Sequence, residues 1–162
     1  MIERTLILIK TDGVQRALVG RIVQRFEDAG FKIVGMKMVW INQEFAKKHY
    51  FDVAQRHGEK VLKFLVDGIT EGPVIAMVLE GVHAIANARK LVGPTYPDQA
   101  LPGTIRGDFA MVSKDYGNTN EKVVKNLVHA SAKKEDAEIE INLWFKKEEL
   151  HTYKTVHEVH TF

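Results

Sequence analysis

One histidine of this sequence is placed where it could act as a nucleophile. His129 ends an apolar run, and Glu140 follows eleven residues later, after a helical stretch that can bring the chain back. A carboxylate bound to one imidazole nitrogen fixes the tautomer and leaves the other nitrogen free to attack. Ser131 could exchange a hydrogen bond with the same groups. A histidine in this position is most often structural, so it indicates chemistry only where anion-binding groups accompany it.

Three groups of cationic and hydroxyl side chains could supply such an anion site. Lys10 ends the first apolar run. Arg89 and Thr95 flank a Gly-Pro loop, and Arg106 lies in a segment punctuated by glycines. Arginine offers phosphate two donors, lysine a point charge and threonine a hydroxyl, although each cation alone is equally well explained as a surface charge. A histidine nucleophile among these groups predicts phosphoryl transfer through a phosphohistidine.

The familiar nucleotide-binding and hydrolase motifs do not occur. The sequence contains no GxxxxGK[ST], GxGxxG, GxSxG or HExxH pattern. Residues 13–20 connect a strand to a helix, where backbone N–H groups can hold phosphate, but the lysine and hydroxyl of a P-loop are missing. His151, His157 and His160 could bind a metal, but a flexible polar tail from about residue 154 is the better interpretation.

The pattern of apolar residues predicts the elements that position these groups. Strands are expected at residues 5–9, 31–41, 73–79 and 123–129. Helices are expected at residues 18–29, 43–54, 59–67, 81–91 and 132–138. This order fits a ferredoxin-like split βαβ arrangement, an α+β fold in which a four-stranded antiparallel sheet carries helices on one face. No repeat or low-complexity linker divides residues 1–162, so a single domain is expected.

Length, composition and charge exclude several classes of protein. The 162 residues are 45% hydrophobic and 27% charged, which is typical of a globular domain and excludes disordered, collagen-like and coiled-coil chains. The absence of cysteine excludes disulfides and thiolate sites and suits the cytoplasm. The longest apolar run, residues 74–79, is too short to span a membrane, and the net charge of +2 gives little reason to expect a nucleic-acid partner.

Several stretches resemble the nucleoside diphosphate kinases, over nearly the whole chain. The most specific are PGTIRGDF at residues 102–109 and the N-x-x-H-x-S pattern at residues 126–131. Further matching stretches are residues 9–16, 18–20, 25–27, 30–31, 49–50, 72–74 and 142–145. The resemblance implies the ferredoxin-like fold and a ping-pong transfer of the terminal phosphate from nucleoside triphosphates to nucleoside diphosphates. It also implies little discrimination between bases.

The resemblance implies a role for each matching residue. His129 takes the place of the phosphorylated histidine, and Glu140 holds its other ring nitrogen. Lys10 matches a lysine that meets the ribose hydroxyl and the transferred phosphate, and Tyr50 matches a tyrosine behind it. The remaining matches are Arg89, Thr95 and Arg106 for the phosphates, Asn126 for a sugar hydroxyl, and Arg56 near the site. Family members use Mg²⁺ held mainly by the nucleotide phosphates and form homo-oligomers, with hexamers favoured here over tetramers.

The sequence departs from the family pattern at the base and before the histidine. The phenylalanine that stacks on the base is missing, since an ungapped comparison places Gly58 there with His57 beside it, which predicts weaker nucleotide affinity. Residues 113–125 hold an insertion, expected to form a surface hairpin or loop near the site or an oligomer contact. Smaller departures are Thr11 for a proline, which loosens that turn, Ala130 for a glycine, and Ala132-Lys133 for an Asp-Ser pair.

Two other functions remain open. The altered base position and the insertion are compatible with a binding or regulatory module that holds a nucleotide without turnover. Against it, every phosphate-binding group and the pair of His129 and Glu140 are present. Nucleic-acid binding has only the sequence pI of about 8.7 in its favour. Exchange of phosphate between two nucleotides would separate an enzyme from a binding module.

Overall fold

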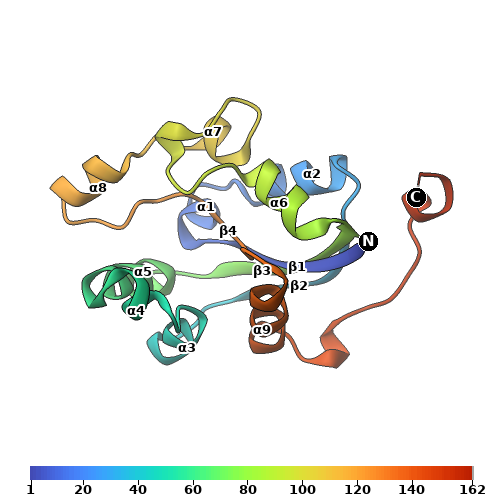
Figure 1. Ribbon diagram of the computed structural model, residues 1–162, viewed down its shortest axis with the longest axis horizontal. Helices are drawn as coiled ribbons and strands as arrows, with labels where there is room; N and C mark the ends of the chain where they lie inside the picture. Colours follow the sequence, from blue (N-terminus) through green and yellow to red (C-terminus); the bar gives the residue numbers. More distant parts are fainter. Residues whose placement is uncertain (162) are drawn as a thin grey trace.

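The computed structural model describes residues 1–161, which contain a four-stranded antiparallel sheet. Its strands are β1 (Ile2–Ile9), β2 (Lys32–Val39), β3 (Val74–Val82) and β4 (Val128–Ala130). They lie in the order β2-β3-β1-β4, and every neighbouring pair is antiparallel (Figure 1). This topology confirms the predicted ferredoxin-like split βαβ fold.

Helices fill each connection between the strands. Between β1 and β2 lie α1 (Thr11–Gln15) and α2 (Val19–Asp28). Between β2 and β3 lie α3 (Gln43–His49), α4 (Val53–His57) and α5 (Glu59–Thr70). Between β3 and β4 lie α6 (Ala84–Val92), the 3₁₀ turn η1 (Pro97–Gln99), α7 (Ile105–Phe109) and α8 (Lys114–Thr119). After β4 come α9 (Lys134–Trp144), the 3₁₀ turn η2 (Lys147–Glu149) and α10 (Val156–His160). Within residues 1–161, no helix is long and apolar enough to cross a bilayer.

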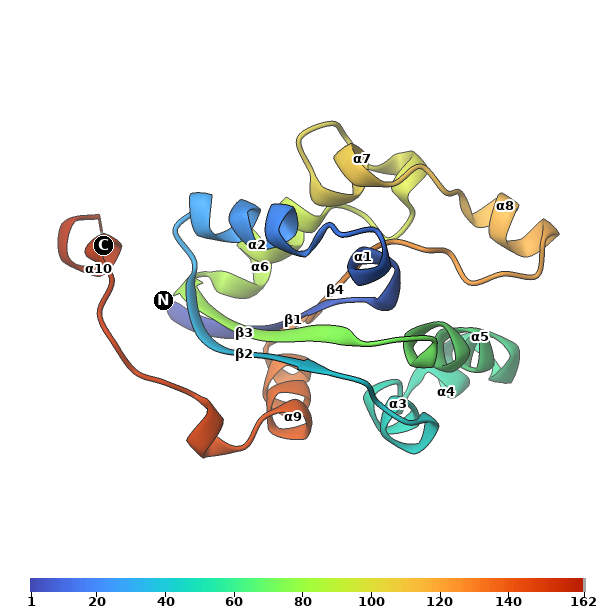
Figure 2. The ribbon, with the colours of Figure 1, turned by 180° about the vertical axis from the view of Figure 1, so that it is seen from behind.

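Helices cover both faces of the sheet, so the prediction of helices on one face is wrong (Figures 1 and 2). Ile7 and Ile9 of β1 join an apolar cluster with residues of α2, α6 and α7. Leu6 and Leu8 join a second cluster with residues of α3, α5 and α9. Successive strand side chains point to opposite faces, so the continuous apolar run of β1 serves two cores. β1 is thereby the buried centre of the fold, and its end carries Lys10.

The segment before the histidine differs most from its predicted form. The fourth strand was expected at residues 123–129, but β4 has only three residues. Leu127, immediately before it, has a φ of 68°, which interrupts an extended strand. Residues 113–125 contain the short helix α8 rather than a hairpin, because the Ser113 hydroxyl caps its start by accepting a hydrogen bond from the Tyr116 N–H at 3.0 Å.

The chain end is anchored where a flexible tail was predicted. Lys32 on β2 is only 6% exposed, and its ammonium lies 2.7 Å from the Glu80 carboxylate and 3.1 Å from that of Glu158 on α10. It also donates to the Tyr153 carbonyl at 2.8 Å. A buried ammonium needs such partners, so the burial of Lys32 draws the last helix onto the edge strand.

Weakening this anchor is expected to release α10 without affecting the rest of the fold. In Glu158→Gln, amides of residues 154–161 should exchange hydrogen faster than in the wild type, while β1 and β3 stay protected. Hydrogen exchange followed by mass spectrometry measures this, and Glu138→Gln, at an exposed position of α9, is the matched control. Equal exchange of these amides in Glu158→Gln and in the wild type would contradict the anchoring role.

The pH range of the anchor follows from its pKa values. Burial lowers the pKa of Lys32, but hydrogen bonds to Glu80 and Glu158 outweigh it and raise the pKa above 10.5. Burial raises the pKa of Glu80, and hydrogen bonds from Lys32 and Arg4 bring it below 4.5. Stabilisation from a lowered carboxyl pKa is lost as the pH falls through the folded value, and that from a raised lysine pKa as the pH rises through it. The anchor should therefore be complete between the ordinary values of 4.5 and 10.5.

Candidate active site

The strand β4 presents His129 at the edge of the sheet. His129 lies opposite Leu8 of β1, and its Nε2 is 2.9 Å from Oε1 of Glu140 on α9. The imidazole is 24% exposed, and within residues 1–161 no hydrogen bond reaches its Nδ1. A carboxylate on Nε2 favours the tautomer with the proton on that nitrogen, so the lone pair of Nδ1 is available. The structure thus brings together the imidazole and carboxylate that their spacing predicted.

The carboxylate of Glu140 is held on both of its oxygens. Ser131 donates its hydroxyl to Oε2 at 2.6 Å, while Oε1 faces His129. The Ser131 oxygen in turn accepts the backbone N–H of Leu6 at 3.1 Å. Glu140 and Ser131 are both buried, so little water competes for these bonds. The orientation of the His129 ring is therefore tied to the central strand through Glu140 and Ser131.

A second histidine packs against the first and had no predicted role. His49, at the end of α3, is 5% exposed, and its ring meets that of His129 edge to face at 4.6 Å between centroids. Trp144 of α9 donates its indole N–H to His49 Nδ1 at 3.2 Å. Burial, and then the charges of His129 and Lys10, hold the pKa of His49 well below 6.5, so this ring is neutral. The matching pair His49-Tyr50 was the only sequence signal for it.

The residue types of this cluster could ligate a metal. Potential ligand atoms of His49, His129 and Glu140 lie within 4.8 Å of one another. However, the indole N–H of Trp144 occupies the lone pair of His49 Nδ1, which places the proton of this neutral ring on Nε2. A protonated nitrogen is no ligand, and Glu140 already faces two protein donors. The geometry therefore favours an ordered histidine over a metal centre.

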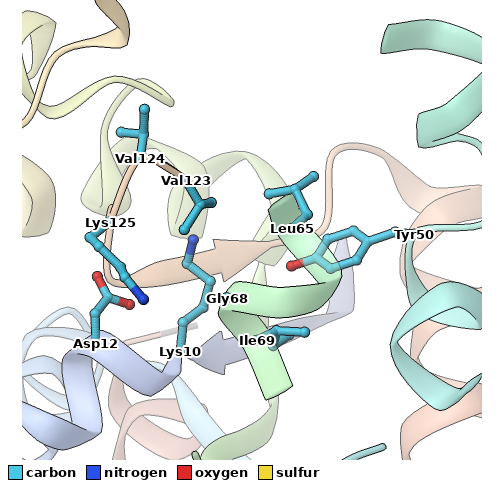
Figure 3. A pocket seen from close by; sticks show the side chains of 9 residues that line it. All are labelled: Lys10, Asp12, Tyr50, Leu65, Gly68, Ile69, Val123, Val124 and Lys125. Carbon is cyan, nitrogen blue, oxygen red and sulfur yellow. The ribbon is translucent and has the colours of Figure 1, made fainter. Parts of the chain in front are cut away.

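Lys10 lies at the end of β1 with its side chain between α5 and the chain at Val123 (Figure 3). Burial lowers the pKa of Lys10 to about 8, and the charges of Arg106 and Lys125 act in the same direction, while Asp12 opposes them. Burial also raises the pKa of Tyr50 nearby, which keeps the phenol neutral. A weakly solvated ammonium of this kind is stabilised by an anion placed beside it.

Arg106 organises the loops around the site. Its guanidinium donates to the carbonyl oxygens of Gly93 and Pro94 at 2.9 Å, Asn126 at 3.0 Å and Val128 at 2.5 Å. A guanidinium has five N–H donors, so one remains for another acceptor. Burial lowers the pKa of Arg106 to about 10, and the charge of nearby Arg89 contributes, which leaves it charged at neutral pH.

Asn126 carries an acceptor that no protein group uses. Its amide nitrogen donates to the Thr95 carbonyl at 2.7 Å. Its Oδ1 is buried and has no hydrogen-bond partner within residues 1–161. An unpaired buried acceptor is costly, and a hydroxyl donor from a ligand would satisfy it.

The turn that contains Thr11 was predicted to be loose, but the structure ties it down. The hydroxyl of Thr11 donates to the carbonyl oxygens of Ile69 and Gly72, and the bond to Ile69 connects the turn to α5.

Most of the predicted site residues line one cavity of about 590 Å³. They are Lys10, Tyr50, Arg56, Thr95, Asn126, His129 and Glu140. Residues of α4 and α5 form one side of the cavity, and the 113–125 segment forms the other. Arg56 also forms an ion pair with Asp52 at 2.9 Å. Arg89, Arg106 and Ser131 are not among the residues that line the cavity. Arg89 is exposed and its charge acts on Arg106, whereas Arg106 and Ser131 are buried.

Gly58, which the ungapped comparison places at the base position, does not reach the cavity, whereas His57 beside it does. Gly58 caps the start of α5 with a φ of 87° and does not line the cavity. The apolar wall is formed about one to two turns further along this helix, by Val61, Phe64 and Leu65. An aromatic side chain, Phe64, is therefore present on this wall.

Comparison with known proteins agrees with this geometry. The family model for nucleoside diphosphate kinase matches residues 3–150. The nucleoside diphosphate kinase of Pyrococcus horikoshii is 51% identical over 152 residues, 93% of this chain and 90% of that protein. A solved structure described as a transition-state mimic of the Borrelia burgdorferi enzyme with vanadate and ADP is 45% identical, with a TM-score of 0.94 and coverage of 97% and 95% of the two chains.

A second solved structure extends the agreement to a more distant relative. The nucleoside diphosphate kinase of Halobacterium salinarum, solved in complex with CDP, is 38% identical and covers 98% of this chain and 97% of its own, with a TM-score of 0.85. Both the fold and nearly the full length of the chain are therefore shared with enzymes of one kind. The chain belongs to the nucleoside diphosphate kinase family and is an enzyme of the activity for which that family is named.

Proposed function

We propose that the enzyme moves the terminal phosphate of a nucleoside triphosphate through a phosphohistidine on His129, in a ping-pong scheme. Nδ1 attacks the terminal phosphorus, the bond from phosphorus to the bridging oxygen breaks, and a nucleoside diphosphate leaves with that oxygen. A second diphosphate then attacks with a terminal oxygen, and the phosphorus–nitrogen bond breaks. The free Nδ1, opposite an Nε2 held by Glu140, is the observation that carries this proposal.

The cations around His129 would stabilise the charge on the transferred group. Lys10 lines the cavity, and within residues 1–161 one N–H donor of Arg106 has no acceptor. We assign these two, with Arg89 and Thr95, to the nucleotide phosphates. The unpaired Oδ1 of Asn126 would accept a sugar hydroxyl. Fixed donors aimed at developing charge are the main source of rate enhancement in phosphoryl transfer.

The remaining assigned groups would support these contacts. Tyr50 lies beside Lys10 with a neutral phenol, and Arg56 lines the outer part of the cavity. Ser131 holds Glu140, which holds His129. Mg²⁺ would be bound mainly by the nucleotide phosphates, where it neutralises their charge, because the carboxylates of Asp12 and Glu140 are engaged by protein donors.

Initial rates with two different nucleotides test the scheme. With ATP and thymidine diphosphate varied against each other, a ping-pong enzyme gives parallel lines in a double-reciprocal plot. Labelled ADP should also exchange into ATP when no second diphosphate is present. Intersecting lines and no partial exchange would contradict the phosphoenzyme. Nucleotide binding without any exchange would identify the chain as a binding module instead.

The low pKa of Lys10 predicts how activity depends on pH. The protonated ammonium attracts phosphate, so kcat/KM should fall about tenfold for each pH unit above about 8, as Lys10 of the free enzyme loses its proton. In Lys10→Arg this fall should vanish, because a guanidinium keeps its charge throughout the range. The kcat/KM profile between about pH 6 and 10 measures this. An identical fall in both proteins would assign the titration to another group.

We also propose that the enzyme is a cytoplasmic homo-oligomer, a hexamer rather than a tetramer. β2 is an edge strand, and it leaves Met36 and Met38 about half exposed, which is typical of a surface that another copy covers. Light scattering after size-exclusion chromatography measures the mass in solution. A monomer would contradict this part of the proposal. Specific nucleic-acid or membrane partners are not proposed.

A further inference from the structure

The 113–125 segment forms one wall of the cavity that contains His129. It comprises α8 and the turn and extended chain that lead back toward β4. α8 lies at the same end of the molecule as α5, on the other side of the sheet layer (Figures 1 and 2). Lys114, Asn118, Lys122, Val123 and Val124 of this segment line the cavity together with residues of α5. The segment is therefore part of the nucleotide cavity and not a remote surface loop.

This wall is fastened to its surroundings at several points. A Cβ atom at Gly68 of α5 would lie 2.9 Å from Val123 Cγ1, so the valine side chain packs directly against the helix backbone (Figure 3). Lys60 of α5 pairs with Glu121 at 2.8 Å, and Lys125 pairs with Glu71. Close packing and charge pairs at separate points give the wall a defined position, which a recognition surface needs.

The lining of the cavity combines apolar side chains with cationic ones. Val61 and Phe64 face it from α5, and Val123 and Val124 face it from the inserted segment, so apolar side chains lie on both sides. The segment also lines the cavity with the exposed residues Lys114, Lys122 and Asn118, which add two ammonium groups and an amide. Within residues 1–161, neither ammonium group forms an ion pair or a hydrogen bond, although that of Lys114 lies 5.8 Å from the centre of the Tyr96 ring. Two ammonium donors without a hydrogen-bond acceptor in the described residues therefore border an apolar slot that suits the face of a base.

We propose that Lys114 and Lys122 select among nucleotides by the edge of the base, and that bases with a carbonyl oxygen are preferred over bases with an amino group at the same position. This rests on the proposed function, in which the cavity binds the nucleotide. An ammonium group only donates. Guanine presents O6 and N7, two acceptors, whereas the exocyclic amine of adenine at position 6 is itself a donor. At position 4, uracil likewise carries a carbonyl oxygen and cytosine an amino group.

Inosine diphosphate and ADP are the sharpest pair of substrates, because their bases differ at position 6 and in the N1 proton that accompanies it. With the phosphoenzyme as donor, kcat/KM for inosine diphosphate should exceed that for ADP roughly three- to tenfold, the range expected for hydrogen bonds from exposed charged donors. GDP should match inosine diphosphate, which shows that the 2-amino group of guanine is not the cause. Uridine diphosphate should likewise exceed cytidine diphosphate.

The double variant Lys114→Met/Lys122→Met should bring the ratio of inosine diphosphate to ADP close to one. Lys48→Met/Lys90→Met removes the same charge from exposed positions outside the cavity and should keep the wild-type ratio. A ratio near one in the wild type, or an unchanged ratio in the cavity variant, would overturn the proposal. Loss of exchange with every nucleotide in the wild type would instead overturn the proposed function, so the two failures are distinguishable.

Discussion

Replacing His129 by asparagine is expected to abolish exchange of phosphate between nucleotides, with a loss of at least about 10⁴-fold in kcat. Asparagine is close in size and keeps a polar group near Glu140, but it offers no nitrogen lone pair that can take the phosphoryl group. A coupled assay with ATP and thymidine diphosphate measures the loss. Incubation with terminally labelled ATP should leave no label on the variant protein.

Two controls make this result specific to the imidazole. His151→Asn changes an exposed histidine outside the cavity and should leave kcat within about twofold of the wild type. Denaturation by urea should show that His129→Asn remains folded, because the backbone pairing of residue 129 with Leu8 does not use the side chain. If the folded variant kept a substantial fraction of wild-type activity, the phosphate would have to pass through another group.

Replacing Arg106 by methionine is expected to lower the free energy of unfolding by about 3–5 kcal/mol, since a buried acceptor left without a donor costs roughly 1–3 kcal/mol. Four backbone carbonyl oxygens on two separate segments, residues 93–94 and 126–128, lose their donor together. The Asn126–Val128 stretch, which leads into His129, should lose its fixed position. Urea denaturation followed by tryptophan fluorescence measures the stability, and the exchange assay measures the accompanying loss of activity.

Arg16→Met is a suitable comparison for this variant. Arg16 donates to a single exposed carbonyl, that of Phe109, at 2.6 Å. Its removal should cost less than about 1 kcal/mol, because water can replace the lost bond. The free energy of unfolding of Arg106→Lys should lie between those of Arg106→Met and Arg16→Met, since one ammonium cannot reach all four acceptors. If Arg106→Met were as stable as Arg16→Met, the four hydrogen bonds would not be the element that holds the site loops together.

The sequence predicted the order of elements along the chain and the fold class, but not the second helical layer. The five-residue run TLILI indicated a strand buried on both faces, which required a second layer, yet the fold class alone led to helices on one face. The length of β4 was overestimated, because residues 123–127 are apolar enough for a strand. Their backbone turns at Leu127, and two valines of the stretch line the cavity instead. Local pattern does not reveal which tertiary surface an apolar residue meets.

The candidate site was predictable where the residues are close in sequence. His129, Ser131 and Glu140 lie on β4, the following turn and α9, so their spacing alone brings them together. His49 packs against His129 and is held by Trp144, and these residues of distant helices meet only because both helices pack on one face of the sheet. The carbonyl contacts of Arg106 are equally invisible, because a backbone acceptor has no sequence signal. Family resemblance supplied Tyr50, Arg56 and Asn126, which spacing did not.

The chemical identity of the phosphorylated atom tests the central claim most directly. The wild-type enzyme, quenched after brief exposure to ATP and Mg²⁺, should carry a phosphate that is labile in acid and stable in base. Peptide mapping by electron-transfer mass spectrometry should place it on His129, and phosphorus NMR of the denatured phosphoprotein should assign it to Nδ1. A phosphate on Ser131, on Nε2 of the ring, or on no residue during active exchange would contradict the account.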